Sequence, residues 1–307
     1  MIQETGDPMK PAQSFHPYAA VTIVFWSLAY VLTRLTLQYF TPFSLGFLRY
    51  LAASCTVLLV LAWKQSKLPR LADLPWISAA GCVGFFLYMI LFNLGQSTVT
   101  ACTASVVIAT VPVITALFAR LFYRERLRAY QWAAMGVEFA GVLVLTLMNG
   151  VLSVNLGVLW LLLAALCLSA YNILQRRLIR SYSPFQASAY SILAGTLLLA
   201  VFAPVSIREV QTAPAIQFLY IAALGIFPSA IAYIAWAKAF SLAPQTSQVS
   251  NYMFVTPFLT SVFGFLLIGE VPDRATLFGG GIILLGVFWF NFGAKLLRAL
   301  RGGQTKP

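Results

Sequence analysis

Ten apolar stretches, each long enough to cross a bilayer, follow one another along this chain with only short polar segments between them. A membrane-spanning helix needs roughly 20 mostly apolar residues. The stretches lie at residues 17–38, 42–63, 74–94, 97–122, 130–148, 156–178, 184–205, 216–237, 244–268 and 275–297. We therefore predict an all-α integral membrane protein with ten transmembrane helices.

The composition leaves no room for a soluble catalytic domain beside these helices. Of 307 residues, 60% are hydrophobic and 9% are charged. The net charge of +12 is typical of nucleic-acid-binding proteins, but membrane proteins also gather Lys and Arg on their cytoplasmic loops. We therefore predict a lipid bilayer, and no nucleic acid, as the partner of this chain.

The basic residues are distributed unequally between the two sides of the membrane. Most lie at the chain ends and in the loops after the second, fourth, sixth and eighth predicted helices, whereas the opposite loops contain only Arg208 and Arg274. Basic loops stay in the cytoplasm. The pattern predicts a multi-pass protein of the plasma membrane, in bacteria the inner membrane, with cytoplasmic tails at residues 1–16 and 298–307.

The two halves of the sequence are related. Residues 84–142 align without a gap with residues 229–287. The alignment pairs Tyr88 with Tyr233, Ser105 with Ser250, Pro112 with Pro257, Thr115 with Thr260, Glu125 with Glu270, Gly136 with Gly281 and Gly141 with Gly286. We predict two five-helix repeats, at residues 17–150 and 151–297. Because five is odd, the second repeat is inverted, as in many secondary transporters.

Several local motifs recur in the two halves and resemble those of a known family. The first half has Phe25-Trp26-Ser27, Arg49, Pro112, Arg124-Glu125-Arg126-Leu127, Gly136 and Gly141, and the second has Pro257, Gly269-Glu270, Gly281 and Gly286. Together they resemble the EamA family of the drug/metabolite transporter superfamily, over about residues 18–292. The resemblance implies a ten-helix exporter or exchanger of small metabolites. Amino-acid exporters, including an aromatic amino-acid subgroup, are the nearest candidates it suggests.

Polar and aromatic residues inside apolar stretches are the candidate substrate site, because polar side chains are costly in lipid and tend to face the bundle interior. Tyr88 and Tyr233 coincide in the repeat, and Trp236, Asn251 and Tyr252 lie nearby in the sequence. We predict that these five residues bind substrate. An alternative for Trp236 is a place in the aromatic belt at the membrane surface.

Four further residues have two interpretations each. Pro112 and Pro257 are predicted to kink their helices, either to shape and gate a central cavity or simply for packing. Glu138 is the one acid within a predicted span, so it is a proton-coupling group or a structural partner of another helix. Arg49 binds a substrate carboxylate or ties helices together.

Nothing in the sequence suggests an enzyme, a cofactor or a metal site. The only histidine is His16, and the four cysteines lie in apolar stretches without the spacing of metal ligands. We predict a secondary active transporter that exports or exchanges small metabolites, namely amino acids or related amphipathic compounds, by alternating access, as a monomer or homodimer. The alternatives are a broad-specificity drug efflux carrier and, from another class, a channel-like pore or lipid scramblase.

Overall fold

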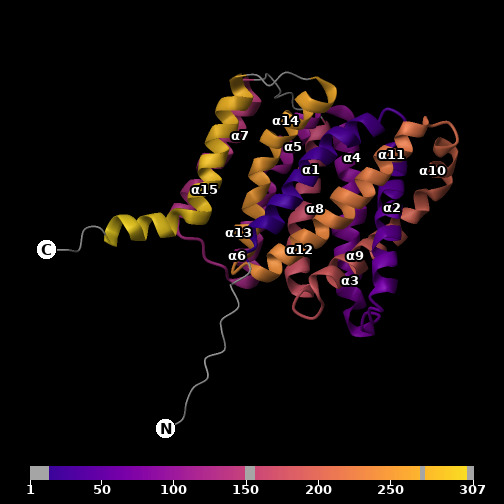
Figure 1. The fold of residues 1–307 in the computed structure, drawn as a ribbon, viewed down its shortest axis with the longest axis horizontal. Helices are drawn as coiled ribbons and strands as arrows, with labels where there is room; N and C mark the ends of the chain where they lie inside the picture. Colours follow the sequence, from indigo (N-terminus) through magenta and orange to yellow (C-terminus); the bar gives the residue numbers. More distant parts are fainter. Residues whose placement is uncertain (1–13, 149–155, 270–273, 303–307) are drawn as a thin grey trace, which may run out of the picture.

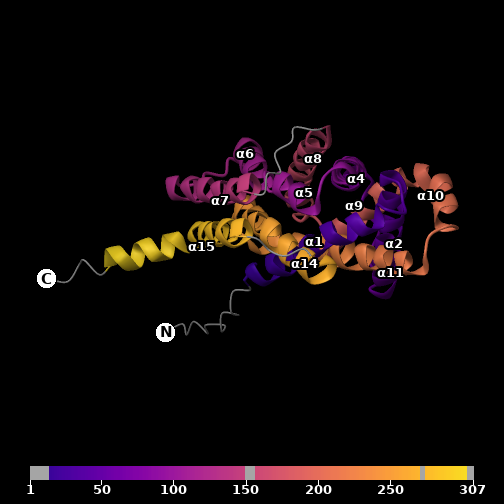
Figure 2. The same ribbon diagram turned by 90° about the horizontal axis from the view of Figure 1, so that it is seen from above.

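The computed structural model describes residues 14–148, 156–269 and 274–302, and these residues form helices joined by turns, with no strand among them. Most helices form one bundle. Two long helices, α7 (Ala129–Met148) and α15 (Arg274–Gly302), lie together at one side of that bundle (Figure 1, Figure 2). The predicted all-α fold is confirmed.

The helices divide into two series along the chain. The first half contains α1 (His16–Thr36), α2 (Pro42–Trp63), α3 (Leu74–Gly81), α4 (Tyr88–Thr98), α5 (Ala101–Ile108), α6 (Val111–Tyr123) and α7. The second half contains α8 (Leu156–Leu178), α9 (Pro184–Leu199), α10 (Ala203–Val210), α11 (Ala215–Leu224), α12 (Ala232–Leu242), α13 (Thr246–Ser250), α14 (Thr256–Ile268) and α15.

Within the described residues, eight helical stretches are long and apolar enough to cross a membrane. They correspond to the predicted spans other than the fifth and the tenth. Those two are α7 and α15, and within α15 the stretch Gly281–Gly293 is apolar but shorter. The ten predicted helices are therefore present, although several of the spans are built from more than one helical piece.

Some helices begin a few residues from the positions predicted from hydrophobicity, because side-chain caps determine where a helix starts. The fourth span begins at Ala101 rather than at residue 97, because the Thr100 hydroxyl accepts a hydrogen bond from the Thr103 amide at 3.1 Å. At the chain ends, α1 begins one residue before the predicted start and α15 continues past residue 297. The predicted tails otherwise lie outside the described residues, apart from the short lead into α1.

Pro112 and Pro257 stand where their spans are interrupted. The chain leaves the helix after α5 and starts a new one, α6, with Pro112 in its first turn. In the second half, a 3₁₀ turn over Asn251–Val255 joins α13 to α14, which has Pro257 in its first turn. A proline in a first turn removes no helical hydrogen bond. The predicted mid-helix kink is therefore a break, and each proline is the second residue of the helix that follows.

The third helix of each repeat contains a π-helical turn. One covers Cys82–Leu87 between α3 and α4, and the other covers Gly225–Ile231 between α11 and α12. The two turns overlap in the repeat alignment. Each stands directly before, or one residue before, a repeat-related tyrosine, Tyr88 or Tyr233. Wide turns of this kind are frequent at functional sites, and here they change the direction in which the following residues face.

Helices of each half pack against helices of the other half. In the first half α1 packs against α12 and α14 of the second, and in the second half α8 packs against α4 and α6 of the first. At the side of the bundle, α7 of the first half packs against α15 of the second half. Each half therefore covers the other with corresponding helices, which is the arrangement expected of two related, inverted units around one centre.

Glycine allows close contact between α7 and α15. A Cβ atom at Gly286 would lie 2.4 Å from Glu138 Cγ and 3.2 Å from the Ala134 carbonyl oxygen. The repeat-related Gly141 has the equivalent contact with the backbone of α15, whereas Gly136 and Gly281 have nothing within 4 Å. Two of the four glycines that the repeat pairs in this way thus bring the helices together, as small residues do in membranes.

This contact gives a matched prediction. Gly286→Ala is expected to lower the free energy of unfolding by about 1–3 kcal/mol, because the added methyl group overpacks the interface between α7 and α15. Gly281→Ala, on the same helix but facing open space, is the control. The measurement is the folded fraction of each detergent-solubilised variant after heating, by size-exclusion chromatography. Equal heat resistance of the two variants would contradict the close packing.

Candidate functional site

A small cavity lies between the two halves, at the centre of the bundle. Its volume is about 20 Å³, which is room for a single water molecule. Its walls come from both repeats and are mostly aromatic. The lining residues are Trp26, Ala29, Tyr30, Arg49, Tyr88, Phe92, Tyr233, Met253 and Thr256. Three of the residues singled out in the sequence, Arg49, Tyr88 and Tyr233, therefore meet here.

Arg49 is the cation of this cavity. It lies in the first half of α2, and its side chain is only 4% exposed. The α2 backbone approaches the π-helical turn of the second half closely, since a Cβ atom at Gly225 would lie 2.8 Å from the Arg49 carbonyl oxygen. This contact brings the guanidinium to the second half, where Nε donates to Ser229 Oγ at 2.6 Å.

No carboxylate of the described residues pairs with Arg49, and its one hydrogen bond to them is the bond to Ser229. A buried charge is costly unless it is paired and hydrogen-bonded. Inside a membrane, an ionisable side chain of this kind marks a substrate or ion pathway by default. The cavity thus presents an unneutralised positive charge to whatever enters it.

Aromatic rings hold the rest of the cavity wall in place. The Trp26 ring lies 5.1 Å from the Tyr233 ring, and its Nε1 donates to the Pro228 carbonyl oxygen at 3.0 Å. On the other wall, the Phe92 ring lies 5.3 Å from the Tyr30 ring and 5.5 Å from the Tyr88 ring. Such rings offer an apolar surface with a few polar edges, the usual composition of small-molecule sites.

Trp236 supports this wall from behind. It does not line the cavity, but its ring lies 5.0 Å from that of Trp26. It is fully buried, and its Nε1 donates to Asn172 Oδ1 at 3.0 Å. A position in an interfacial aromatic belt is therefore wrong for Trp236, and contact with a substrate would require the cavity to enlarge.

Asn251 and Tyr252 are directed away from the cavity. Asn251 Nδ2 donates to Glu138 Oε1 of α7 at 3.0 Å. The Tyr252 hydroxyl lies 2.5 Å from Nδ1 of His16, at the start of α1. Because the backbone here is a 3₁₀ helix, residues three apart share a face, and it is Met253 and Thr256 that line the cavity.

Glu138 lies in a second polar site, outside the central cavity. Its side chain is fully buried, and one carboxyl oxygen accepts the bond from Asn251. The other oxygen has no hydrogen-bond partner among the described residues. Arg49 and Glu138 are thus not an ion pair, and each is a separate buried polar group that the protein retains inside the membrane.

Five residues line the cavity although the sequence does not predict them as site residues, namely Trp26, Tyr30, Phe92, Met253 and Thr256. Two of them carried a usable signal, since Trp26 stands in the family-like motif and the pair Ala29-Tyr30 recurs in the second half. Phe92, Met253 and Thr256 carried none, because nothing distinguishes them from other residues of apolar helices.

Hydrogen bonds from the second half to Glu125 hold the two halves together at one end of the cavity. At the end where α1 begins, the Glu125 carboxylate accepts from the Thr246 amide at 2.9 Å and from the Thr246 hydroxyl at 2.8 Å, and so caps α13. At the opposite end, Arg34 Nη1 donates to the Val99 carbonyl oxygen at 3.2 Å, which ties α1 to the segment between α4 and α5 within the first half. The repeat counterpart of Glu125, Glu270, lies outside the described residues.

The sequence is similar to those of known membrane transporters along most of its length. The model of the EamA-like transporter family matches residues 15–147 and again residues 155–292. An uncharacterized transporter of Bacillus subtilis, YdfC, is 34% identical over 87% of this chain and 88% of its own length. A probable terminal-alkyne amino-acid exporter of Streptantibioticus cattleyicolor is 30% identical over 88% of this chain and 91% of its own length.

More distant similarities agree with these matches. An uncharacterized inner membrane transporter of Escherichia coli, YedA, is 25% identical over 90% of each chain. One solved crystal structure has the same fold, with a TM-score of 0.72 at 20% identity over 92% of this chain and 98% of that one. The chain is therefore a member of the EamA-like transporter family, a multi-pass membrane transporter in which the family unit occurs twice.

Proposed function

We propose that this transporter carries a small amphipathic metabolite with a carboxylate group, most plausibly an amino acid, in the cavity between its halves. The observation that supports the proposal is Arg49, a buried guanidinium without a carboxylate partner in the described residues, surrounded by aromatic rings. Arginine suits a carboxylate because its planar donors match both carboxylate oxygens. The rings suit the apolar part of the same molecule.

The transport mechanism we propose is alternating access. The cavity of about 20 Å³ is too small for an amino acid, so in this proposal it expands when the substrate binds. We propose that the helices bend at the two interrupted spans, α5 with α6 and α13 with α14, when the cavity opens. Pro112 and Pro257 are the second residues of α6 and α14 and thus lie at the proposed hinges.

The relative from Streptantibioticus cattleyicolor, named as an amino-acid exporter, supports this substrate class. A broad-specificity efflux carrier for organic compounds is the second candidate, because an aromatic wall also accepts apolar compounds without a carboxylate. The hydrogen bonds from Thr246 to Glu125 hold the halves together at one end of the cavity and favour a carrier over a channel-like pore or a scramblase, since a pore requires both ends open at once.

Counterflow in liposomes tests the proposed substrate class. Liposomes with the purified transporter are loaded with one unlabelled amino acid after another, and uptake of the labelled compound is followed. For an accepted amino acid we expect saturable counterflow, and about 100-fold weaker counterflow for its amide, which lacks the carboxylate that Arg49 would bind. Equal transport of acid and amide would favour the broad-specificity carrier, and flux without counterflow would favour a pore.

We also propose that both termini are cytoplasmic, on the basis of the basic loops. A cytoplasmic reporter enzyme fused after Pro307 is expected to be active, and a periplasmic reporter at the same place inactive. Fusion after Gln211, in a loop predicted to lie on the other side, is the control and should give the opposite result. A periplasmic signal after Pro307 would contradict the orientation.

A further inference from the structure

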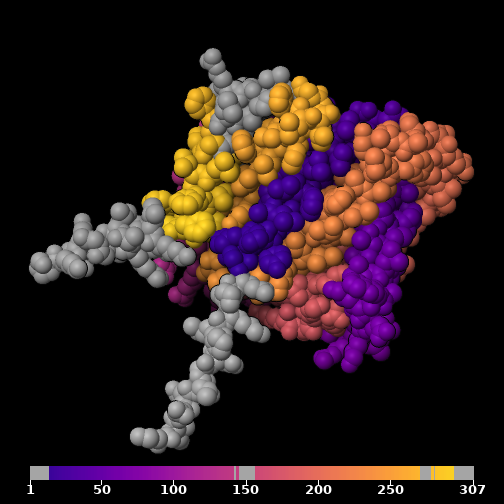
Figure 3. Space-filling model, viewed as in Figure 1, coloured from indigo at the N-terminus to yellow at the C-terminus, as the bar shows by residue number. Residues whose placement is uncertain are grey.

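A second, much larger space lies outside the central site, at the seam between the halves. This groove has a volume of about 920 Å³, near the upper end of about 300–1,000 Å³ typical of small-molecule sites. Figure 3 shows α1, α12 and α2 next to one another on one face of the molecule. The groove is lined by Tyr18, Val21, Lys64, Ser66, Ser183, Pro184, Phe185, Gln186, Ile231, Ile234, Ala235 and Lys238.

The groove is separated from the central cavity by α12. On one face of this helix, Tyr233 lines the central cavity and Trp236 packs behind its wall, while Ile234, Ala235 and Lys238 line the groove. The groove is therefore a different site from the one proposed for the transported metabolite.

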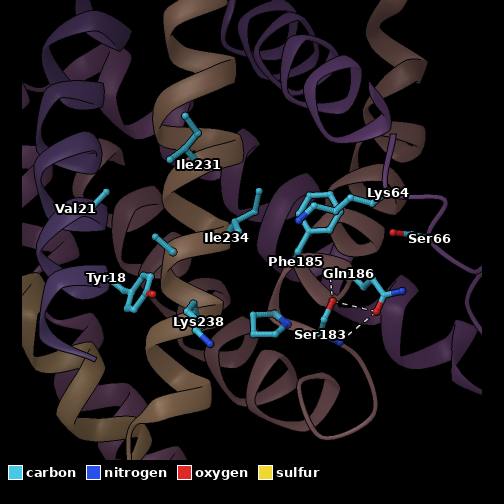
Figure 4. A pocket seen from close by; sticks show the side chains of 12 residues that line it. Tyr18, Val21, Lys64, Ser66, Ser183, Phe185, Gln186, Ile231, Ile234 and Lys238 are labelled. Carbon is cyan, nitrogen blue, oxygen red and sulfur yellow. Dashed lines mark hydrogen bonds between the residues drawn. The ribbon is translucent and has the colours of Figure 1, made fainter. Parts of the chain in front are cut away.

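The groove has a charged end and an apolar end. Figure 4 shows Lys238 on α12 near Ser183, and Lys64 across the groove beside Phe185, while Val21 and Ile231 lie farther from Lys238 along α1 and α12. Neither lysine has an acidic partner in the described residues. The Lys64 ammonium lies 5.1 Å from the centre of the Phe185 ring, and no acid lines the groove.

This polarity matches the position of the groove in the membrane. Lys64 directly follows the last residue of α2, and Ser183 directly precedes α9, so the charged end stands where helices leave the membrane. Val21 and Ile231 are 43% and 39% exposed, and both lie within predicted membrane spans. The basic loops predict that the charged end faces the cytoplasm, where lipid headgroups are often anionic and attract lysines.

We propose that this groove binds one anionic phospholipid, with its phosphate between Lys64 and Lys238 and an acyl chain against Val21, Ile231 and Ile234. The occupant has to combine an anionic group with an apolar chain at the membrane surface, and a phospholipid of the surrounding bilayer has this chemistry. Because α1 and α2 belong to one half and α9 and α12 to the other, the bound lipid would bridge the two halves.

Binding of phosphatidylglycerol to the detergent-purified full chain, measured by native mass spectrometry, tests the headgroup contact. Each lysine is expected to contribute about fivefold to the affinity, so Lys64→Gln with Lys238→Gln should weaken binding by about 30-fold. The control removes two exposed charges just outside the groove, Lys67→Gln with Arg70→Gln, and should change binding less than twofold.

A second pair of variants tests the acyl-chain contact independently of charge. Val21→Trp is expected to fill the groove and weaken phosphatidylglycerol binding at least about tenfold, because the indole ring takes the place of buried acyl-chain CH₂ groups. Val24→Trp is the control, because Val24 lies on the same helix and is 41% exposed but does not line the groove. If Val21→Trp does not fold, the lysine pair still decides the proposal.

Competition experiments identify the occupant. Phosphatidylcholine and soluble glycerol phosphate are both expected to compete poorly, the first for lack of net charge and the second for lack of a chain. Equal competition by phosphatidylcholine would overturn the charge recognition, and equal competition by glycerol phosphate would make the groove a site for free phosphate. Unchanged phosphatidylglycerol binding in the double lysine variant would overturn the proposal altogether, whatever the transported metabolite is.

Discussion

Replacement of Arg49 by Gln is expected to reduce transport of a carboxylate substrate by about 100-fold while the protein still reaches the membrane. Removing one partner of a buried, hydrogen-bonded charge pair costs about 2–5 kcal/mol, and a hundredfold loss of affinity corresponds to about 2.7 kcal/mol. The guanidinium is 4% exposed and has no carboxylate partner in the described residues, so the substrate would supply the missing anion.

Three further variants separate substrate binding from a structural role for Arg49. Arg49→Lys keeps the charge but loses the two-pronged geometry, so transport should fall less than in Arg49→Gln. Ser229→Ala removes the hydrogen bond from Nε but leaves the charge, and should have a small effect. Arg120→Gln, at an exposed position on α6, is the control for loss of a positive charge.

The readout is the concentration dependence of counterflow for each variant, together with the amount of protein in the liposomes. If Arg49 only ties α2 to the second half, Ser229→Ala and Arg49→Gln should destabilise the protein to a similar extent. Transport of the acid and of its amide should then fall by the same factor. That outcome would remove Arg49 from the substrate site.

The membrane spans could be predicted from the sequence because spanning requires length and apolarity, and both are written along the chain. The division of several spans into two or more helical pieces could not be predicted. Nothing in Cys82–Leu87 or Gly225–Ile231 distinguishes a π-helical turn from an α-helix by hydrophobicity. In the same way, a proline predicts an irregularity, but only the packed structure decides whether the chain kinks or, as at Pro112, breaks.

The candidate site was partly predictable for a different reason. Tyr88 and Tyr233 are related by the repeat, and a residue pair at the symmetry centre of two inverted units tends to face the shared cavity. Asn251 and Tyr252 are predicted from their polarity and their depth within an apolar stretch, without a matching residue in the other repeat. Polarity shows that a side chain needs a partner but not where the partner lies, and for Asn251 that partner is on α7.

Glu138→Gln is expected to abolish proton-driven accumulation of substrate while substrate exchange continues. The carboxyl group is fully buried, with one oxygen bonded to Asn251 and the other without a partner in the described residues. An intramembrane carboxyl group of this kind is a default candidate for a proton relay. Gln has the same shape and can still accept the hydrogen bond from Asn251, so packing against Gly286 is preserved.

Exchange and proton-driven uptake, measured in the same liposomes, distinguish a coupling role for Glu138 from a structural one. Exchange moves no net proton, whereas accumulation against a gradient requires one. Glu125→Gln is the contrasting control, because Glu125 caps α13 from the neighbouring loop and its loss should weaken both activities together. If Glu138→Gln also lowers both activities equally, or leaves both intact, Glu138 is a helix-packing residue and the driving force enters elsewhere.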